Sequence, residues 1–373
     1  MITNKGYARG IKGTRLFLVS SKNKLIQLSD KYILKVEPSS KYIFIKNLLT
    51  SSDHVKNCQR SITSLDNKFV NSLNDGDVIS VSDDGTVNVL WKCKSKENLL
   101  FLTDYCNSRC IMCPQTQTEQ NKHYYNLSQE LLKLVKEKPD YLCLTGGEPT
   151  FLKSEYIKIL SCIKDKMPNV ALQVLTNGKN FSDFDFAKQS VLNAPVNTLY
   201  AIPIYSGNSK LHDNIVCSNG SFTKTVKGIL NLYKLKQNIE LRIVITKQNY
   251  KDLPNIAHFI YWNMPFVYRI AFMGMETHGN AANNLDLVWI EPKEYTFYLN
   301  EAVQFLNNRM LDVLIYNLPH CILPSELRSF AKDSISDWKK NFLPECDGCS
   351  KQQVCSGVFT TSVNTISGIN KIY

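Results

Sequence analysis

Short apolar stretches alternate with polar positions throughout residues 1–95, which is the two-residue period of β-strands. These stretches fall at residues 15–19, 25–28, 32–36, 42–45, 77–82 and 86–91. The last two flank Asp84 and Gly85, a pair typical of tight hairpin turns. Residues 51–67 have no clear period and fit either a helix or a loop. The pattern predicts a β-rich N-terminal domain.

From residue 99 onward, apolar strands alternate with amphipathic helices, the order typical of a parallel sheet covered by helices. We expect strands at residues 99–103, 141–144, 170–175, 198–204, 241–245 and 267–272. We expect helices at residues 127–137, 155–166, 184–192, 222–235, 256–262 and 293–308, with Ser154 and Ser221 as two of the caps. Residues 312–316 are a candidate further strand. Six strand–helix units predict an open partial (β/α)6 barrel, because a closed barrel needs eight.

Composition and charge describe an ordinary globular protein of 373 residues, 43% hydrophobic and 21% charged. Residues 1–13 lack the apolar core of a signal peptide, and no run of 18 apolar residues exists. We therefore expect a cytoplasmic protein without a membrane span. The net charge of +11 comes from lysines and arginines spread along the chain. This spread favours solvated helix faces over a nucleic-acid surface.

Seven of the twelve cysteines form two groups, which favours metal ligation over disulfides in a chain without a secretion signal. The first group, Cys106, Cys110 and Cys113, follows the strand at 99–103 with C-x3-C-x2-C spacing. Three thiolates hold three irons of a [4Fe–4S] cluster and leave the fourth iron open for a ligand. A zinc site completed by His123 or Cys143 is the alternative.

The next strand runs directly into Gly146, Gly147 and Glu148. Glycine lets a backbone approach a ligand closely, and a glutamate accepts hydrogen bonds from an ammonium group. Ligands of such barrels gather at the carboxyl ends of the strands. Other polar residues expected at strand ends are Asn177, Ser206 and Asn249, which either bind a ligand carboxylate or ribose or cap the following helices.

The sequence leaves two alternative roles for each of two further polar residues. Arg242, inside the strand at 241–245, is either a partner for a ligand carboxylate or a surface residue. His212 is expected to be structural or to face a substrate.

Together the cysteine and Gly-Gly-Glu motifs resemble the radical S-adenosylmethionine (SAM) superfamily. The resemblance implies that the open iron chelates SAM, and that Gly146, Gly147 and Glu148 bind its amino group. It implies reductive cleavage of SAM to a 5′-deoxyadenosyl radical that abstracts a hydrogen from a substrate. It also implies a reductant such as flavodoxin or ferredoxin. Met112 stands where this superfamily often has an aromatic residue, and it is expected to pack against adenine equally well.

The second cysteine group combines Cys321 with the spacing Cys346-x2-Cys349-x5-Cys355. Four thiolates match a fully ligated [4Fe–4S] cluster or a zinc site. With four thiols present, His320 is not needed as a ligand. The spacing resembles the auxiliary-cluster domain of peptide-modifying radical SAM enzymes. A full domain has a further cysteine where this chain has Phe359, so we expect one auxiliary cluster, and favour iron–sulfur over zinc.

A closer resemblance covers residues 99–362 and rests on segments 273–292, 315–321, 334–349 and 354–359. They are similar to the C-component maturase of the His-Xaa-Ser peptide system. The resemblance implies a ribosomally made precursor peptide as substrate and a second radical SAM partner. A radical SAM enzyme acting on RNA or a small metabolite is the alternative, and a non-enzymatic iron–sulfur or zinc scaffold is a more distant one.

The predicted organisation has three domains: a β-rich domain over residues 1–95, a radical SAM partial barrel over 96–310, and a Cys-rich auxiliary domain over 311–373.

Overall fold

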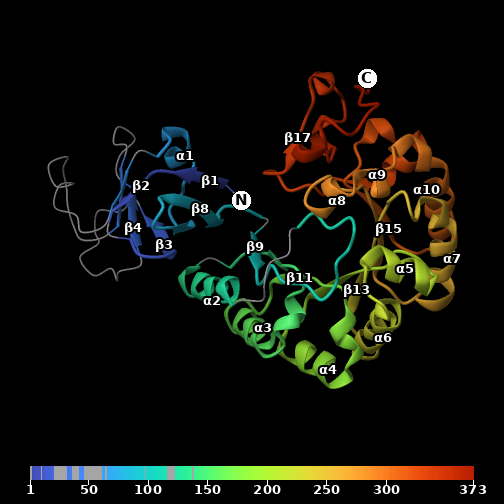
Figure 1. The fold of residues 1–373 in the computed structure, drawn as a ribbon, viewed down its shortest axis with the longest axis horizontal. Coiled ribbons are helices and arrows are strands. Elements are labelled where there is room, and N and C mark those ends of the chain that lie inside the picture. The colour runs from blue at the N-terminus through green and yellow to red at the C-terminus, as the bar shows by residue number, and fades with distance from the viewer. Residues whose placement is uncertain are drawn as a thin grey trace.

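Two eight-stranded sheets organise the chain in the computed structural model (Figure 1). The structure describes residues 2–9, 11–20, 32–35, 42–45, 61–63, 65–96, 98–115, 122–136 and 138–373. The strand expected at 25–28 and residues 51–60 of the unpatterned stretch lie outside the described residues. Among the described residues, none of the helices combines the length and hydropathy needed to span a bilayer.

The first sheet has the strand order β1-β8-β7-β3-β4-β5-β6-β2. Its strands are β1 (Ile2–Lys5), β2 (Tyr7–Arg9), β3 (Arg15–Ser20), β4 (Tyr32–Lys35), β5 (Tyr42–Ile45), β6 (Ser61–Thr63), β7 (Val78–Val81) and β8 (Thr86–Trp91). The short helix α1 (Asn67–Asn71) begins after Asp66, whose side chain accepts hydrogen bonds from two backbone N–H groups. The described part of this region forms a β-sheet, but the strands β1, β2 and β6 were not expected. The strand β6 lies in the stretch 51–67, which was expected to be a helix or a loop.

Alternation along β3 gives the first sheet two apolar faces. Phe17 and Val19 pack into a core formed by this sheet, α1 and the segments next to them. Leu16 and Leu18 point the other way and join the large core of the second sheet. The N-terminal sheet is therefore packed against the barrel. The predicted domain boundaries at 95/96 and 310/311 stay predictions.

The second sheet is parallel, and its strands follow one another in chain order. They are β9 (Asn98–Phe101), β10 (Tyr141–Thr145), β11 (Ala171–Leu175), β12 (Thr198–Pro203), β13 (Asn238–Val244), β14 (Arg269–Met273), β15 (Val313–Tyr316) and β16 (Ala331–Lys332). The six expected strands and the candidate seventh are present, and β16 is an addition. The α/β fold with a parallel sheet is confirmed, and it is consistent with a partial barrel.

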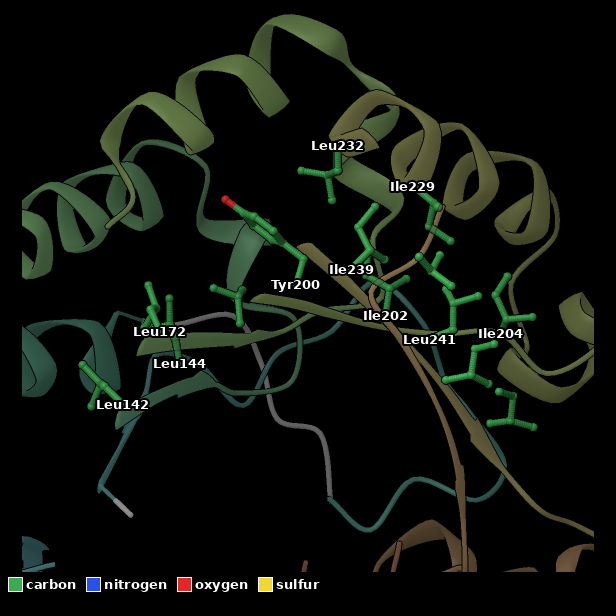
Figure 2. Packing of buried hydrophobic residues seen from close by; sticks show 14 of the residues in the cluster. Leu142, Leu144, Leu172, Tyr200, Ile202, Ile204, Ile229, Leu232, Ile239 and Leu241 are labelled. Atoms are coloured by element: carbon green, nitrogen blue, oxygen red, sulfur yellow. The ribbon is translucent and has the colours of Figure 1, made fainter. Parts of the chain in front are cut away.

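Helices form an arc along the outer side of this sheet (Figure 1). Those in the barrel region are α2 (His123–Leu134), α3 (Ser154–Lys166), α4 (Phe184–Asn193), α5 (Ser209–Val216), α6 (Ser221–Lys234), α7 (Leu253–Asn263), α8 (Asn280–Asn283), α9 (Leu285–Val288) and α10 (Pro292–Asn307). Alternate strand residues such as Ile239 and Leu241 pack with Ile229 and Leu232 of α6 (Figure 2). The intervening positions, including Cys143 and Arg242, consequently face the inner side of the sheet.

Two expected helix caps are wrong. Ser154 and Ser221 are the first residues of α3 and α6 rather than the caps that precede them. Ser154 Oγ donates to the Glu155 carboxylate. At α6, the Asp213 carboxylate accepts from the backbone N–H groups of Gly220 and Phe222 at 2.6 and 2.7 Å. A side chain from another helix thus supplies the cap, which no local pattern indicates.

Candidate active site

Cys106, Cys110 and Cys113 lie half-buried on the loop after β9, which we call the Cys loop (residues 102–115). Burial, followed by the nearby Glu148 carboxylate, raises the pKa of Cys106 to about 12. Burial and the neighbouring Cys113 and Cys106 also raise the pKa of Cys110, and burial raises that of Cys113. These thiols are close enough to affect one another's ionisation. A bound cation would offset this cost, because metal ligation requires thiolates.

Lys179 holds the Cys loop from one side. Its buried ammonium donates to the Asn107 carbonyl at 2.6 Å, to Ser108 Oγ at 2.8 Å and to Ser218 Oγ at 3.1 Å. The same positive charge lies near Cys106 and Cys110 and partly offsets the rise in their pKa values. Sequence reasoning missed Lys179. Its only local signal is its place directly after the turn that ends β11.

We expect Lys179→Met to weaken retention of iron by the Cys loop. Methionine fills much of the space of the aliphatic stem but leaves three acceptors without their donor, and an unpaired buried acceptor such as Ser108 costs about 1–3 kcal/mol. Lys188→Met on the exposed surface of α4 is the matched control. Iron content after anaerobic reconstitution and chemical unfolding test this expectation. Equal iron content in Lys179→Met and Lys188→Met would contradict the role of Lys179 in holding the Cys loop.

Helix α8 holds the Cys loop from the opposite side. The Asn280 backbone N–H donates to the Cys113 carbonyl at 2.9 Å, and its Nδ2 donates to the Cys110 carbonyl at 3.2 Å. Asn284 Nδ2 donates to the Ile111 carbonyl at 3.1 Å. The loop that carries the three thiols is therefore positioned by contacts from distant parts of the chain.

Met112 is 4% exposed and packs in a cluster with Tyr205, Ile215 and Met275. Met112 thus contacts the protein's own side chains, and its expected contact with adenine stays a prediction. The Cys loop is anchored through this apolar cluster as well as through its hydrogen bonds.

Gly146 and Gly147 make room for the Cys loop. A Cβ atom on Gly146 would lie 2.5 Å from the Thr103 carbonyl oxygen, and one on Gly147 would lie 2.3 Å from the Tyr105 carbonyl oxygen. The Gly147 N–H donates to the Thr103 carbonyl at 2.7 Å. These glycines are required because two backbone segments meet here, whatever ligand the turn also binds.

Glu148 is fully buried, and four donors from the protein surround its carboxylate. Oε1 accepts from the backbone N–H and hydroxyl of Thr150 and, at 2.7 Å, from Thr176 Oγ1. Oε2 accepts from the Asn177 backbone N–H at 2.6 Å. Burial raises the pKa of Glu148, while these hydrogen bonds oppose the rise. The carboxylate therefore ties the ends of β10 and β11 together.

Asn177 is the one predicted strand-end residue that lies beside the Cys loop. Its Nδ2 donates to Asn107 Oδ1 at 2.7 Å and lies 3.9 Å from Cys106 Sγ. Ser206 is instead fully buried, donating to Asp252 at 2.6 Å and accepting from the Asn208 N–H, while Asn208 itself is the N-cap of α5.

The polar side chains of three other predicted site residues, Asn249, His212 and Arg242, contact groups of the protein itself. The fully buried Asn249 accepts from the Thr246 backbone N–H at 2.8 Å. His212 Nδ1 accepts weakly from the Tyr205 N–H, and burial lowers the pKa of this histidine to about 4, which fits a structural role. Arg242 pairs with the buried Glu240 at 2.6 Å, so its carboxylate partner belongs to the protein.

The C-terminal cysteines line one cavity, together with His320. The cavity's four thiols belong to Cys321, Cys346, Cys349 and Cys355. Backbone N–H groups of Gly357 and Ile372 each donate at 3.4 Å to the sulfurs of Cys355 and Cys349. The Ile372 bond is the main cause that lowers the pKa of Cys349, whereas burial raises the pKa of Cys321 and Cys346.

The donor chemistry of both cysteine groups fits iron–sulfur ligation. Three thiols on one loop suit a cluster with one open iron, and four thiols around one cavity suit a fully ligated group. In the part of the chain that the structure describes, no group of three or more His, Cys, Asp or Glu side chains is arranged to hold a single metal ion.

Residues 100–260 match the family model described as the radical SAM superfamily. The match contains the Cys loop, the Gly-Gly-Glu turn and Asn177. This part of the chain is similar to the radical SAM superfamily. The motifs that define the radical SAM region in sequence are the ones that the fold brings together at one end of the parallel sheet. Among curated proteins, none matches the chain.

Solved structures with a similar fold include Streptococcus suis SuiB bound to the precursor peptide SuiA, with 13% identity and a TM-score of 0.47 over 59% of this chain and 48% of that one. Another is anSMEcpe with bound AdoMet and the Kp18Cys peptide, with 16% identity and a TM-score of 0.44 over 58% and 63%. A third is coproporphyrinogen III oxidase from Escherichia coli, with 12% identity and a TM-score of 0.43 over 57% and 52%. The chain thus spans about half the length of SuiB.

Proposed function

We propose that this chain is a radical SAM enzyme that modifies a ribosomally made peptide in the cytoplasm. The observation that carries the proposal is the set of three thiols on one loop, whose backbone is hydrogen-bonded to the Gly-Gly-Glu turn at the end of the parallel sheet. With a cluster, SAM and an electron from flavodoxin or ferredoxin, such a site supplies a 5′-deoxyadenosyl radical that takes a hydrogen from the substrate. The protein's part is to bind, orient and exclude water.

Each motif then has a role. Cys106, Cys110 and Cys113 hold the [4Fe–4S] cluster as thiolates. Because protein donors already surround the Glu148 carboxylate, the carbonyl groups of Gly146 and Gly147 are the acceptors that we assign to the SAM ammonium. Asn177 is the polar side chain best placed to contact SAM, since it lies next to Cys106.

The segment 276–284 contacts both the Cys loop and the C-terminal region that carries the second cysteine group, which supports a shared task. At one end, Glu276 pairs with Lys339 at 2.7 Å, and Thr277 Oγ1 donates to the Thr361 carbonyl at 2.9 Å. At the other end, Asn280 and Asn284 hold the Cys loop. This segment belongs to the sequence that resembles His-Xaa-Ser maturases. A precursor peptide of the His-Xaa-Ser type is accordingly our proposed substrate, with a second radical SAM protein as partner.

We propose that the C-terminal cysteines hold one auxiliary [4Fe–4S] cluster. Two such clusters require about eight irons per chain, whereas zinc at the second site would leave about four irons and one zinc. Replacing Cys346 and Cys349 by Ala should halve the iron, preserve some SAM cleavage and stop peptide modification. The exposed Cys217→Ala is the control and should change none of these. Stoichiometric zinc, or full peptide modification by the double variant, would count against an auxiliary cluster.

Mass spectrometry of a candidate peptide tests the function. The purified, anaerobically reconstituted chain is incubated with SAM, reductant and a peptide that carries His-Xaa-Ser repeats, with and without the partner protein. We expect a SAM-dependent mass change in the peptide. An unchanged peptide together with salt-sensitive retention of RNA would favour the RNA alternative.

A further inference from the structure

One imidazole shares the cavity of the four C-terminal cysteines. His320 precedes Cys321 in a short 3-10 turn (His320–Ile322), and its side chain is 8% exposed. Its backbone carbonyl accepts from Arg328 Nε at 3.1 Å, which fixes the turn. Neither Nδ1 nor Nε2 has a hydrogen-bond partner among the described residues. The Val354 carbonyl is near the ring but does not meet hydrogen-bond geometry.

An unpaired imidazole is unfavourable in a protein interior. In either protonation state the ring carries at least one N–H donor, and buried donors are nearly always paired with protein, water or a bound group. The other polar side chains that line this cavity are the four thiols, Lys351, Gln352 and Asn370. A thiol is a weak acceptor, but a sulfur that carries negative charge is a stronger one. The orphaned ring therefore points to a charged sulfur as its partner.

We propose that His320 donates an N–H hydrogen bond to a sulfur of the iron–sulfur group held by Cys321, Cys346, Cys349 and Cys355, and so raises its reduction potential. The inference rests on the auxiliary cluster of the proposed function. A hydrogen bond to sulfur stabilises the reduced state, which carries one more negative charge. Four thiolates fill the four iron positions, so the imidazole is free to act as a donor. His320 is thus a positioning residue that sets the potential of the group.

The test compares His320→Phe with His320→Gln in the full chain. Phenylalanine keeps a planar ring and removes the donor, whereas the glutamine amide restores a donor on a side chain of similar reach. Both are combined with Cys106, Cys110 and Cys113→Ala, so that the remaining iron belongs to the C-terminal group. The two His320 variants are also measured in the holoenzyme with its three Cys-loop cysteines intact, in case the protein without these cysteines folds poorly. His258→Phe, on the exposed face of α7, is the control.

Iron content and an EPR-monitored redox titration are the readouts. We expect unchanged iron in all variants. In His320→Phe the reduced-to-oxidised ratio at a fixed potential should fall about tenfold, which is about 59 mV for a one-electron couple. His320→Gln should recover most of this shift, and His258→Phe should show none.

Three results would overturn the inference, and they differ from one another. An unchanged midpoint reduction potential in His320→Phe excludes the hydrogen bond from His320 to the cluster sulfur. Loss of iron in both His320 variants makes the imidazole a ligand instead of a donor. If the protein with its native His320 holds no iron at the C-terminal site, the auxiliary-cluster proposal itself is wrong. This result is obtained before any His320 variant is made.

Discussion

Simultaneous replacement of Cys106, Cys110 and Cys113 by Ala is expected to abolish formation of 5′-deoxyadenosine from SAM and to remove about half of the iron. The three thiols are the proposed ligands of the cluster that binds SAM, and all three lie on the Cys loop. The auxiliary cluster should remain, because its thiols line a separate cavity. Product analysis by chromatography and iron quantification are the measurements.

Cys143→Ala and His123→Ala are the matched controls for this prediction. Both were alternatives for the fourth ligand of a zinc site. Cys143 lies in β10, and His123 begins α2. The cluster assignment predicts full iron and full 5′-deoxyadenosine in both variants. Continued 5′-deoxyadenosine formation by the triple variant would show that the assignment of the Cys loop is wrong.

Glu148→Gln is expected to have the second largest effect, on both SAM binding and stability. The amide keeps the shape of the carboxylate but loses its charge. One acceptor oxygen becomes an NH2 group, which then faces the Thr176 hydroxyl or the Asn177 N–H, both of which donate to Glu148. Hydrogen bonds to a charged group contribute about 1.5–3 kcal/mol each. We expect weaker SAM binding through displacement of the Gly-Gly-Glu turn, a lower free energy of unfolding and unchanged iron content.

Calorimetric SAM titration, chemical unfolding and iron analysis separate these effects. Glu155→Gln, whose carboxylate pairs with exposed Lys122 at the surface, is the control and should leave SAM binding unchanged. Loss of iron in Glu148→Gln would mean that this residue also maintains the Cys loop. Wild-type stability together with weak SAM binding would mean that the carboxylate itself receives the ammonium, as the sequence alone predicts.

The barrel strands were predictable because their signals are local. Apolar runs such as 141–144 end in turn residues and alternate with helical periods, and β10 (Tyr141–Thr145) forms there. The spacing of the Cys loop is likewise contained in eight consecutive residues. By contrast, β1 and β2 are short strands whose partners are far away in sequence, and β16 is too short for a period to mark it.

The contacts that complete the site could not be read from the sequence for a related reason. Lys179 meets Asn107 across 72 positions, and Asn280 meets Cys110 across 170. The glycines at 146 and 147 did indicate a close approach, but only the fold shows that the approaching group is the backbone of the Cys loop. Glu148 was expected to face a ligand, and Ser206 either to face a ligand or to cap a helix. The structure surrounds both side chains with protein donors and acceptors.

The most direct test of the radical SAM proposal is the production of 5′-deoxyadenosine by the anaerobically reconstituted chain, given SAM and a chemical reductant. We predict 5′-deoxyadenosine and methionine in equal amounts, dependent on the reductant and absent from protein without iron. A chain that binds its full iron and SAM but releases no 5′-deoxyadenosine, even with peptide and partner present, would contradict the proposal.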